Sequence, residues 1–402
     1  MIGAADITAV GRRLAERSGA APPSAWDLRI ETEGVCEVPA ALRHAKHLAL
    51  MRAYQARYVL LPTGALSGSI VDCLRRHYDP QEMAALEALR HGLEAELIAP
   101  AVAAARANAR GRDWRAYAEA LQTEVASQPE NAFVAYVRTS SHREAHYRQF
   151  LLQSSADLLA EASASALGVV GEFGAPQSAL FRILIDEFGY GVHGKKHSVL
   201  YRAVMRDFGL PDEYNACWPL FDTATLDLHN TVHHLFQNPA NFFLQVGFLL
   251  FAETAYQRST QDHFRYLREF HPQADARYFG EHAHIDLHHT AMVIEEVAAP
   301  LVANYGADVG VEIVAGAELT RRAFDDAGAH MLATARAFDN AAAGGQATPS
   351  APDMAGLGRG VTATGAAALA ETERLQVGGL GQVTAGVFAG FPADAYARRL
   401  VS

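Results

Sequence analysis

The chain has 402 residues, of which 50% are apolar and 20% are charged, a composition typical of a globular protein with a large core. A formal net charge of -11 argues against nucleic acid or an anionic membrane as the main partner. Three widely separated cysteines, Cys36, Cys73 and Cys217, argue against a disulfide framework and favour the cytoplasm. No signal-peptide pattern opens the chain, and the longest apolar run, residues 242–252, is too short to cross a membrane.

Residues 1–130 predict a series of helices separated by proline-containing breaks. The segment from Gln81 to Ala99 is rich in alanine, leucine and glutamate, which are strong helix formers. No cluster of ligand-type residues occurs in this part of the chain. We expect residues 1–130 to form a helical scaffold that builds a homodimer.

The next predicted helix runs from Arg143 to about Gly168 and carries Glu161. Small residues, Ala-Ser-Ala-Ser-Ala, follow this glutamate and allow another helix to approach closely. Glu161 is therefore either an exposed helical residue or a ligand of a buried site. This segment alone leaves both interpretations open.

A second helix carries Glu187 and His197, which are ten residues apart. Gly191 and Gly194 lie four and seven residues after Glu187, and glycine inside a helix costs roughly 1 kcal/mol relative to alanine. The two glycines predict either open space beside Glu187 or an irregular helix. At about 100° per residue an ideal helix leaves Glu187 and His197 roughly 80° apart, so a kink or bulge is needed to bring them together.

A third helix is predicted from Asn241 to about Phe270, and its apolar first half ends at Glu253. A buried carboxylate at that position needs a partner, a proton or a cation. The following helix, to Pro300, places His282, Asp286 and His289 at i, i+4 and i+7, so they share one face. An exposed, histidine-rich face is the alternative interpretation of that helix.

A last helix is predicted from about Ala303 to Asn340, and residues 341–402 form a Gly/Ala-rich linker and tail. The middle domain then spans residues 131–340. Four successive helices of this domain carry four carboxylates and three imidazoles: Glu161, Glu187, His197, Glu253, His282, Asp286 and His289. Two divalent ions balance four carboxylates, and this oxygen and nitrogen donor set suits iron or manganese rather than structural zinc or an iron–sulfur cluster.

A ferritin-like site needs two Glu-x-x-His pairs, and only Glu281 and His284 have that spacing. The ordered set instead resembles the haem-oxygenase-like diiron oxidases and oxygenases. Their signature is a lone Glu, then Glu followed by His, then Glu, then His-x-x-x-Asp-x-x-His, each on its own helix. The resemblance covers about residues 143–335.

This resemblance implies an all-α fold, a haem-oxygenase-like helical bundle to which the N-terminal helices are added. It implies two Fe(II) per chain held by the seven residues, O2 as co-substrate and a small amino-acid-type substrate, with an external electron donor in some members. The ten-residue spacing between Glu187 and His197 most resembles that in the branch of the family that contains amino-acid N-oxygenases. N-oxygenation is therefore the favoured outcome, and desaturation, carbon–carbon cleavage and ring formation are alternatives. The nitrosourea-forming relatives carry a metal-binding cupin after this domain, but nothing after Asn340 supplies cupin histidines.

A different class of function is a haem-binding or cofactorless protein on the same all-helical fold, with one histidine as haem ligand or base. A purely structural or partner-binding role for the helices is another. Neither gives Glu161, Glu187 and Glu253 a reason to share a site.

Overall fold

The structure is a computed structural model that describes residues 39–59, 61, 69–214, 217 and 220–343. Every regular element in these residues is helical, which confirms the predicted all-α class. The predicted tail beyond residue 343 lies outside the described residues, as do two of the proline-containing breaks predicted within residues 1–130, those at Pro22-Pro23 and at Pro62. Across the described residues, no helix is both long and apolar enough to span a membrane.

Among the described residues, six helices precede residue 140: α2 (Pro39–Gln55), α3 (Ile70–His77), α4 (Pro80–Leu97), α5 (Ala99–Ala109), α6 (Trp114–Ser127) and α7 (Ala132–Thr139). Helix α4 lies where the alanine- and leucine-rich segment predicts a helix. Asp113 caps α6 by accepting a hydrogen bond from the Ala116 amide at 2.8 Å, and Asn131 caps α7 in the same way. These caps explain why both short helices begin where they do.

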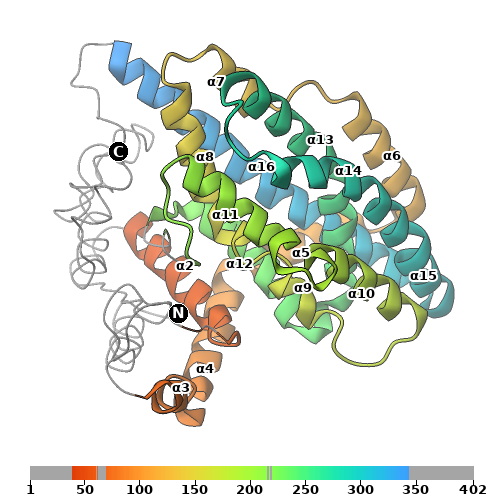
Figure 1. Ribbon diagram of the computed structural model, residues 1–402. Helices are drawn as coiled ribbons and strands as arrows, with labels where there is room; N and C mark the ends of the chain where they lie inside the picture. Colours follow the sequence, from red (N-terminus) through yellow and green to blue (C-terminus); the bar gives the residue numbers. More distant parts are fainter. Residues whose placement is uncertain (1–38, 60, 62–68, 215–216, 218–219, 344–402) are drawn as a thin grey trace.

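The long helix α16 (Ala307–Ala343) runs through the bundle, and the other long helix, α13 (Phe242–Phe270), packs along it (Figure 1). Helix α5 also packs against α16, and α2 packs against α12 (Thr223–Gln237). The buried apolar side chains of all these helices form one continuous cluster. The domain boundary near residue 130 stays a prediction.

Two glycines set the distance between α13 and α16. A Cβ on Gly247 would lie 2.0 Å from the Ile313 carbonyl oxygen, and a Cβ on Gly316 would lie 2.0 Å from the Leu244 carbonyl oxygen. Both distances are far below van der Waals contact, so only glycine fits. This close packing fixes the position of α13, the helix that carries Glu253.

The predicted helix from Arg143 to Gly168 is interrupted, so that prediction is wrong in its second half. Helix α8 (Arg143–Leu158) ends before Glu161, and a short helix, α9 (Ser163–Leu167), follows. Ala162 between them has a left-handed backbone with φ of 68°. Such a conformation costs an alanine about 1–2 kcal/mol, so tertiary contacts rather than local preference impose the break.

The segment around Glu187 is also irregular, as one of the two predicted alternatives requires. Helix α10 (Ala175–Glu187) ends at Glu187, two 3-10 turns follow at Gly189–Gly191 and His193–Lys195, and α11 (His197–Asp207) begins at His197. Gly189 has a φ of 61°, and a Cβ on it would lie 2.4 Å from the Lys195 carbonyl carbon. A Cβ on Gly191 or Gly194, the two glycines of the prediction, would meet nothing within 4 Å, and Gly191 has a φ of 78°. The irregular helix is therefore present, and the space around these two glycines is open.

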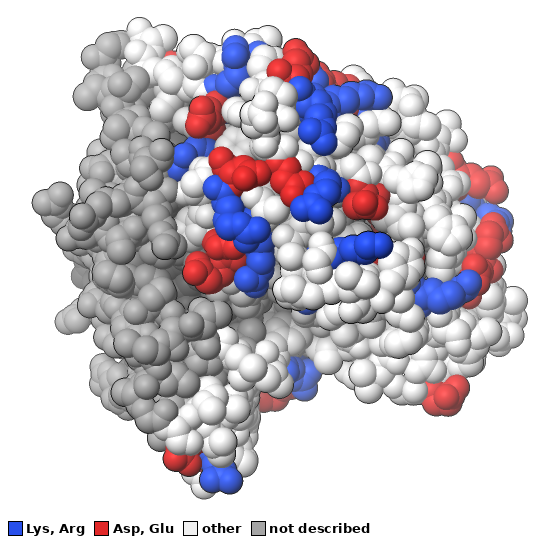
Figure 2. Space-filling model, in the orientation of Figure 1, with Lys and Arg blue, Asp and Glu red and all other residues white. Residues whose placement is uncertain are grey.

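The histidine-rich helix α14 (Arg277–Met292) continues as a π-helical turn, Val293–Ala298, and then as α15 (Ala299–Tyr305). Pro300 stands in the first turn of α15, and Gly306, with a φ of 98°, separates α15 from α16. The predicted helix to Pro300 is thus present with a π turn inside it. On the face shown in Figure 2, acidic and basic side chains are interspersed, so this face offers no broad basic surface for nucleic acid.

Candidate metal centre

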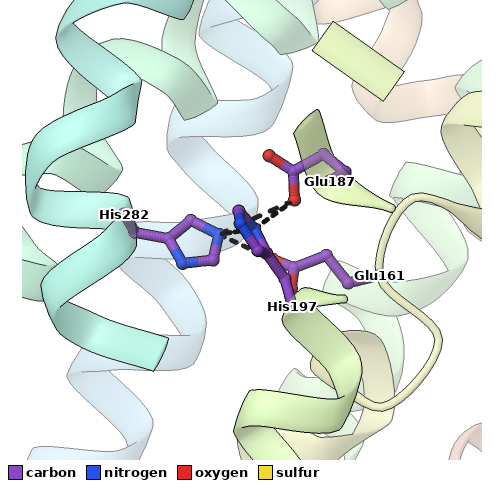
Figure 3. Close-up of side chains that lie close together, drawn as sticks. All are labelled: Glu161, Glu187, His197 and His282. Atoms are coloured by element: carbon purple, nitrogen blue, oxygen red, sulfur yellow. Dashed lines mark hydrogen bonds and ion pairs between the residues drawn. The ribbon is translucent and has the colours of Figure 1, made fainter. Parts of the chain in front are cut away.

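The structure brings all seven predicted residues into two neighbouring groups inside the bundle. The first group is Glu161, Glu187, His197 and His282, and the second is Glu253, Asp286 and His289. In each group, one donor atom from every residue lies within 4.8 Å of the others. Figure 3 shows the first group, whose side chains converge from separate elements.

In the first group, three close distances join the four side chains. His197 Nδ1 lies 2.6 Å from Glu187 Oε2 and 3.1 Å from His282 Nε2 (Figure 3). His282 Nε2 lies 3.2 Å from Glu161 Oε1. Two imidazole nitrogens and two carboxylates therefore face one point, which a cation or shared protons must occupy.

In the second group, the carboxylates surround one imidazole nitrogen. His289 Nδ1 lies 3.2 Å from Glu253 Oε2 and 3.9 Å from Asp286 Oδ1. The same nitrogen lies 3.7 Å from Glu187 Oε1, whereas Glu187 Oε2 faces the first group. Glu187 thus directs one oxygen toward each group and connects them.

Hydrogen bonds outside the two groups fix which imidazole nitrogen is available. His282 Nδ1 donates to the Tyr278 carbonyl oxygen at 2.9 Å, so Nε2 is the nitrogen that faces Glu161 and that a metal ion would take in place of a proton. His289 Nε2 lies 3.1 Å from Asp186 Oδ2 and donates to it, which leaves Nδ1 toward Glu253. Partners of this kind orient metal-binding histidines in proteins.

Two of these supporting residues escaped the sequence reasoning. The Tyr278 hydroxyl donates to Glu161 Oε1 at 2.8 Å, and Asp186 accepts from His289. Tyr278 lies four residues before His282, so the helical periodicity carried a signal for it. Asp186 had no such signal, because adjacent residues on a regular helix point about 100° apart.

The charges of the two groups perturb one another strongly. Burial raises the pKa of Glu187, but the charge and hydrogen bond of His197 outweigh it and lower that pKa to about 2. Burial lowers the pKa of His289, but the hydrogen bond and charge of Glu253 raise it to about 9. Burial, together with the charges of Glu253 and Glu187, raises the pKa of Asp286 well above its usual value. Protons therefore supply the positive charge that these carboxylates require.

Three buried oxygens in the groups have no hydrogen-bond partner: both oxygens of Asp286 and Oε2 of Glu161. Leaving a buried polar atom unsatisfied costs about 1–3 kcal/mol. Cations bound between the side chains would satisfy all of them. The donor set contains only carboxylate oxygens and imidazole nitrogens, which suits iron. The residues present therefore fit two divalent metal ions.

A cavity of about 130 Å³ adjoins both groups. Glu161, Glu187, Glu253, His282 and Asp286 line one part of it. Most of the remaining wall is apolar and includes Leu158, Leu180, Ile183, Val232, Phe236 and Leu249. A roughly 150 Å³ cavity holds a benzene-sized molecule, so the space suits a small ligand.

Comparisons with known proteins agree with this centre. Residues 148–325 match the model of a family described as iron-containing redox enzyme. Nitrosourea synthase of Streptomyces achromogenes subsp. streptozoticus is 34% identical over 274 residues, which are 67% of this chain and 57% of that protein. The chain thus spans little more than half the length of this curated relative.

Among solved structures, a cadd-like protein of unknown function from Nostoc punctiforme aligns with a TM-score of 0.43 and 17% identity, over 55% of this chain and 96% of that one. This likeness is too distant to support an argument about function. The segment that matches the family of iron-containing redox enzymes includes every one of the seven candidate ligands, from Glu161 to His289, and over this segment the chain is similar to that family.

Proposed function

We propose that the chain binds two Fe(II) ions through Glu161, Glu187, His197, Glu253, His282, Asp286 and His289 and uses O2 to oxidise a small amino-acid-type substrate. The observation that carries the proposal is the pair of adjacent donor groups with orphaned buried carboxylate oxygens, joined by Glu187. Two ferrous ions held there would supply the electrons that activate O2. The ligand assignment and the number of metal ions are parts of this proposal.

The chain's own residues orient the donors and shape the reaction space. Tyr278 holds Glu161 through its hydroxyl and His282 through its carbonyl oxygen, and Asp186 holds His289. Most of the cavity wall away from the centre is apolar, which disfavours water beside the donors. Burial raises the pKa of Tyr256, which lines the same cavity, so its hydroxyl stays protonated and can donate a hydrogen bond to a bound ligand.

N-oxygenation is the favoured reaction because the curated relative is named nitrosourea synthase, a product class that contains a nitrogen–oxygen bond. Insertion of one oxygen atom into an N–H bond uses O2, two further electrons and two protons, and releases one water molecule. An external donor must therefore return two electrons to the iron after each turnover. The substrate itself supplies none of these two electrons.

Desaturation of an aliphatic substrate is the second candidate, and the apolar cavity wall favours it. In that reaction the substrate gives up two hydrogen atoms, an external donor supplies two further electrons and solvent two protons, and O2 is reduced to two water molecules. Carbon–carbon cleavage and ring formation remain open to the same centre. A haem-binding role is disfavoured because a cavity of about 130 Å³ is far smaller than a porphyrin.

Anaerobic titration with Fe(II) tests the metal assignment. The wild-type chain should bind two ions, and Glu187→Ala or His289→Ala should clearly lower this number while the helical circular dichroism stays unchanged. His288→Ala is the matched control, because His288 is exposed on the same helix and should leave the count at two. Full iron loading of both ligand variants would contradict the assignment.

Mixing the Fe(II)-loaded chain with O2 and a panel of amino acids, amines and guanidino derivatives tests the reaction. One panel member should accelerate O2 consumption. A product with one added oxygen supports N-oxygenation, whereas a product lacking two hydrogens supports desaturation. No O2 uptake with any member would remove the amino-acid assignment and leave the metal assignment standing.

We also propose that the N-terminal helices build a homodimer. Within residues 1–130, the region predicted to form the dimer interface, three apolar side chains are exposed in or near α3: Val59, Ile70 and Val71. Light scattering should give twice the chain mass of 43.3 kDa. A monomer at micromolar concentration would contradict this.

A further inference from the structure

A polar cluster that the metal centre does not use lines the same cavity. Asp157 on α8 and His233 on α12 are both part of the cavity wall. Behind them lies His229, a fully buried residue of α12. His229 Nδ1 lies 2.7 Å from Asp157 Oδ1, and the rings of His229 and His233 stack with centroids 4.0 Å apart.

The hydrogen bonds of this cluster leave two acceptors for a ligand. His229 donates to Asp157 Oδ1, so Asp157 Oδ2 is left for a ligand. His233 Nδ1 donates to the His229 carbonyl oxygen at 2.9 Å, so its Nε2 carries a lone pair. Burial and the neighbouring His229 lower the pKa of His233 to about 3, which keeps this ring neutral.

The charges around the cavity select a cation. Five carboxylates line it, Asp157, Glu161, Glu187, Glu253 and Asp286, and none of its described lining residues is lysine or arginine. Two divalent ions would balance the four carboxylates of the metal centre. Asp157, which accepts from His229 and is 28% exposed, would remain as an extra negative charge on the cavity wall, where it attracts a cationic ligand.

We propose that Asp157 and His233 form a subsite that binds the ammonium group of an aliphatic substrate, with the alkyl chain along the apolar wall toward the metal centre. This inference rests on the proposed oxygenase function and adds the substrate class and its orientation. Asp157 and His233 line the same cavity of about 130 Å³ as Glu161 and Glu253, so the subsite and the centre are close in space. Oxidation would then fall on the end of the substrate remote from the bound ammonium group.

A third metal ion is a poorer match for this cluster. The hydrogen bond between His229 and Asp157 already uses Nδ1 of His229 and Oδ1 of Asp157. His233 Nδ1 is used in the hydrogen bond to the His229 carbonyl oxygen. Toward the cavity only one oxygen of Asp157 and Nε2 of His233 remain, because His229, whose Nε2 has no partner, does not line it. Protein metal sites usually supply three or four ligands. An ammonium group carries three N–H donors and needs only such acceptors.

Binding of simple probes to the Mn(II)-loaded full-length chain tests the subsite. n-Pentylammonium and 1-pentanol each have six heavy atoms, and they differ mainly in charge. The wild-type chain should bind n-pentylammonium about 10- to 100-fold more tightly, as expected for a hydrogen bond to a charged group. Asp157→Asn keeps the size and an acceptor for His229 and should abolish this preference, with manganese content and circular dichroism unchanged.

Asp308→Asn is the matched control, because Asp308 is an exposed aspartate outside the cavity, and it should keep the preference. Equal affinity for both probes in a wild-type chain that loads two ions and consumes O2 would overturn the subsite while the proposed function stands. A chain that binds no iron would instead remove the proposed function. Binding of a third manganese ion that Asp157→Asn eliminates would also overturn the ammonium subsite.

Discussion

Removing the carboxylate of Asp186 is expected to weaken metal binding without touching a candidate ligand. Asp186 Oδ2 accepts a hydrogen bond from His289 Nε2 at 3.1 Å, and the Asp186 side chain is only 13% exposed. This bond fixes the ring so that Nδ1 faces Glu253. In Asp186→Ala the ring loses that restraint, and its buried Nε2 proton loses its acceptor.

The magnitude follows from the type of hydrogen bond. A bond to a charged group contributes about 1.5–3 kcal/mol, and about 1.4 kcal/mol changes an equilibrium constant tenfold. Asp186→Ala should therefore weaken one of the two binding events about 10- to 100-fold, the range typical for lost supporting partners of metal-bound histidines. Asp186→Asn keeps an oxygen acceptor and should recover part of the loss.

Isothermal titration with Mn(II), which is stable in air at neutral pH, measures both binding events. The ion at Glu253, Asp286 and His289 should bind more weakly, whereas the ion at the first group should bind nearly as in the wild-type chain. Unchanged affinity of both ions in Asp186→Ala would refute the assigned role of Asp186. A melting scan of the apo variants separates this effect from a general loss of stability.

Three other predictions concern pH and packing. His289 has a pKa of about 9 and is protonated at pH 7, so a metal ion must displace its proton. The affinity for that metal ion should therefore rise about tenfold per pH unit between pH 6 and 8. Calorimetric titrations in two buffers with different ionisation enthalpies should detect the released proton. Conversely, the stability that protonated His289 gives the metal-free chain is complete below pH 6.5 and is lost as the pH rises through about 9. Burial lowers the pKa of His263 to about 3, so the stability that neutral His263 gives the folded chain is complete above pH 6.5 and is lost as the pH falls toward 3. At pH 5 the free energy of unfolding should be about 2 kcal/mol lower than at pH 7 because of this residue. In denaturant titrations, His263→Phe should remove this loss. Gly247→Ala should destabilise the chain by more than about 2 kcal/mol because of the contact between α13 and α16, whereas Gly328→Ala, with open space around its Cβ, should stabilise it by up to about 1 kcal/mol in the same assay.

The burial of the candidate residues on α13 and α14 was predictable because their sequence patterns persist in these regular helices. His282, Asp286 and His289 share a face of α14, as the spacing requires, and all three are buried. Glu253 follows an apolar run of α13, which explains why its helix is packed inside the bundle. The all-α class followed from the same helical patterns. The roles of these residues as ligands stay a prediction for the iron titration.

The sequence does not show the two helix interruptions that bring Glu161 and Glu187 next to the candidate ligands of α14. No glycine or proline marks the end of α8, and the residues around Glu161 are good helix formers. The break arises from packing against other elements, which a local pattern does not contain. Asp186 and Glu187 reach different partners because α10 ends there, a boundary that helical periodicity alone does not define.

The departures from regular structure gather at the candidate ligands. In the described part of the chain, Ala162 and Tyr190 are the non-glycine residues with positive φ, at 68° and 56°. Ala162 follows Glu161 directly, and Tyr190 lies three residues after Glu187. The π-helical turn begins four residues after His289. Each strained residue costs about 1–3 kcal/mol and persists only where surrounding contacts impose it, so their position beside the ligands indicates that the fold holds the donors against local preference.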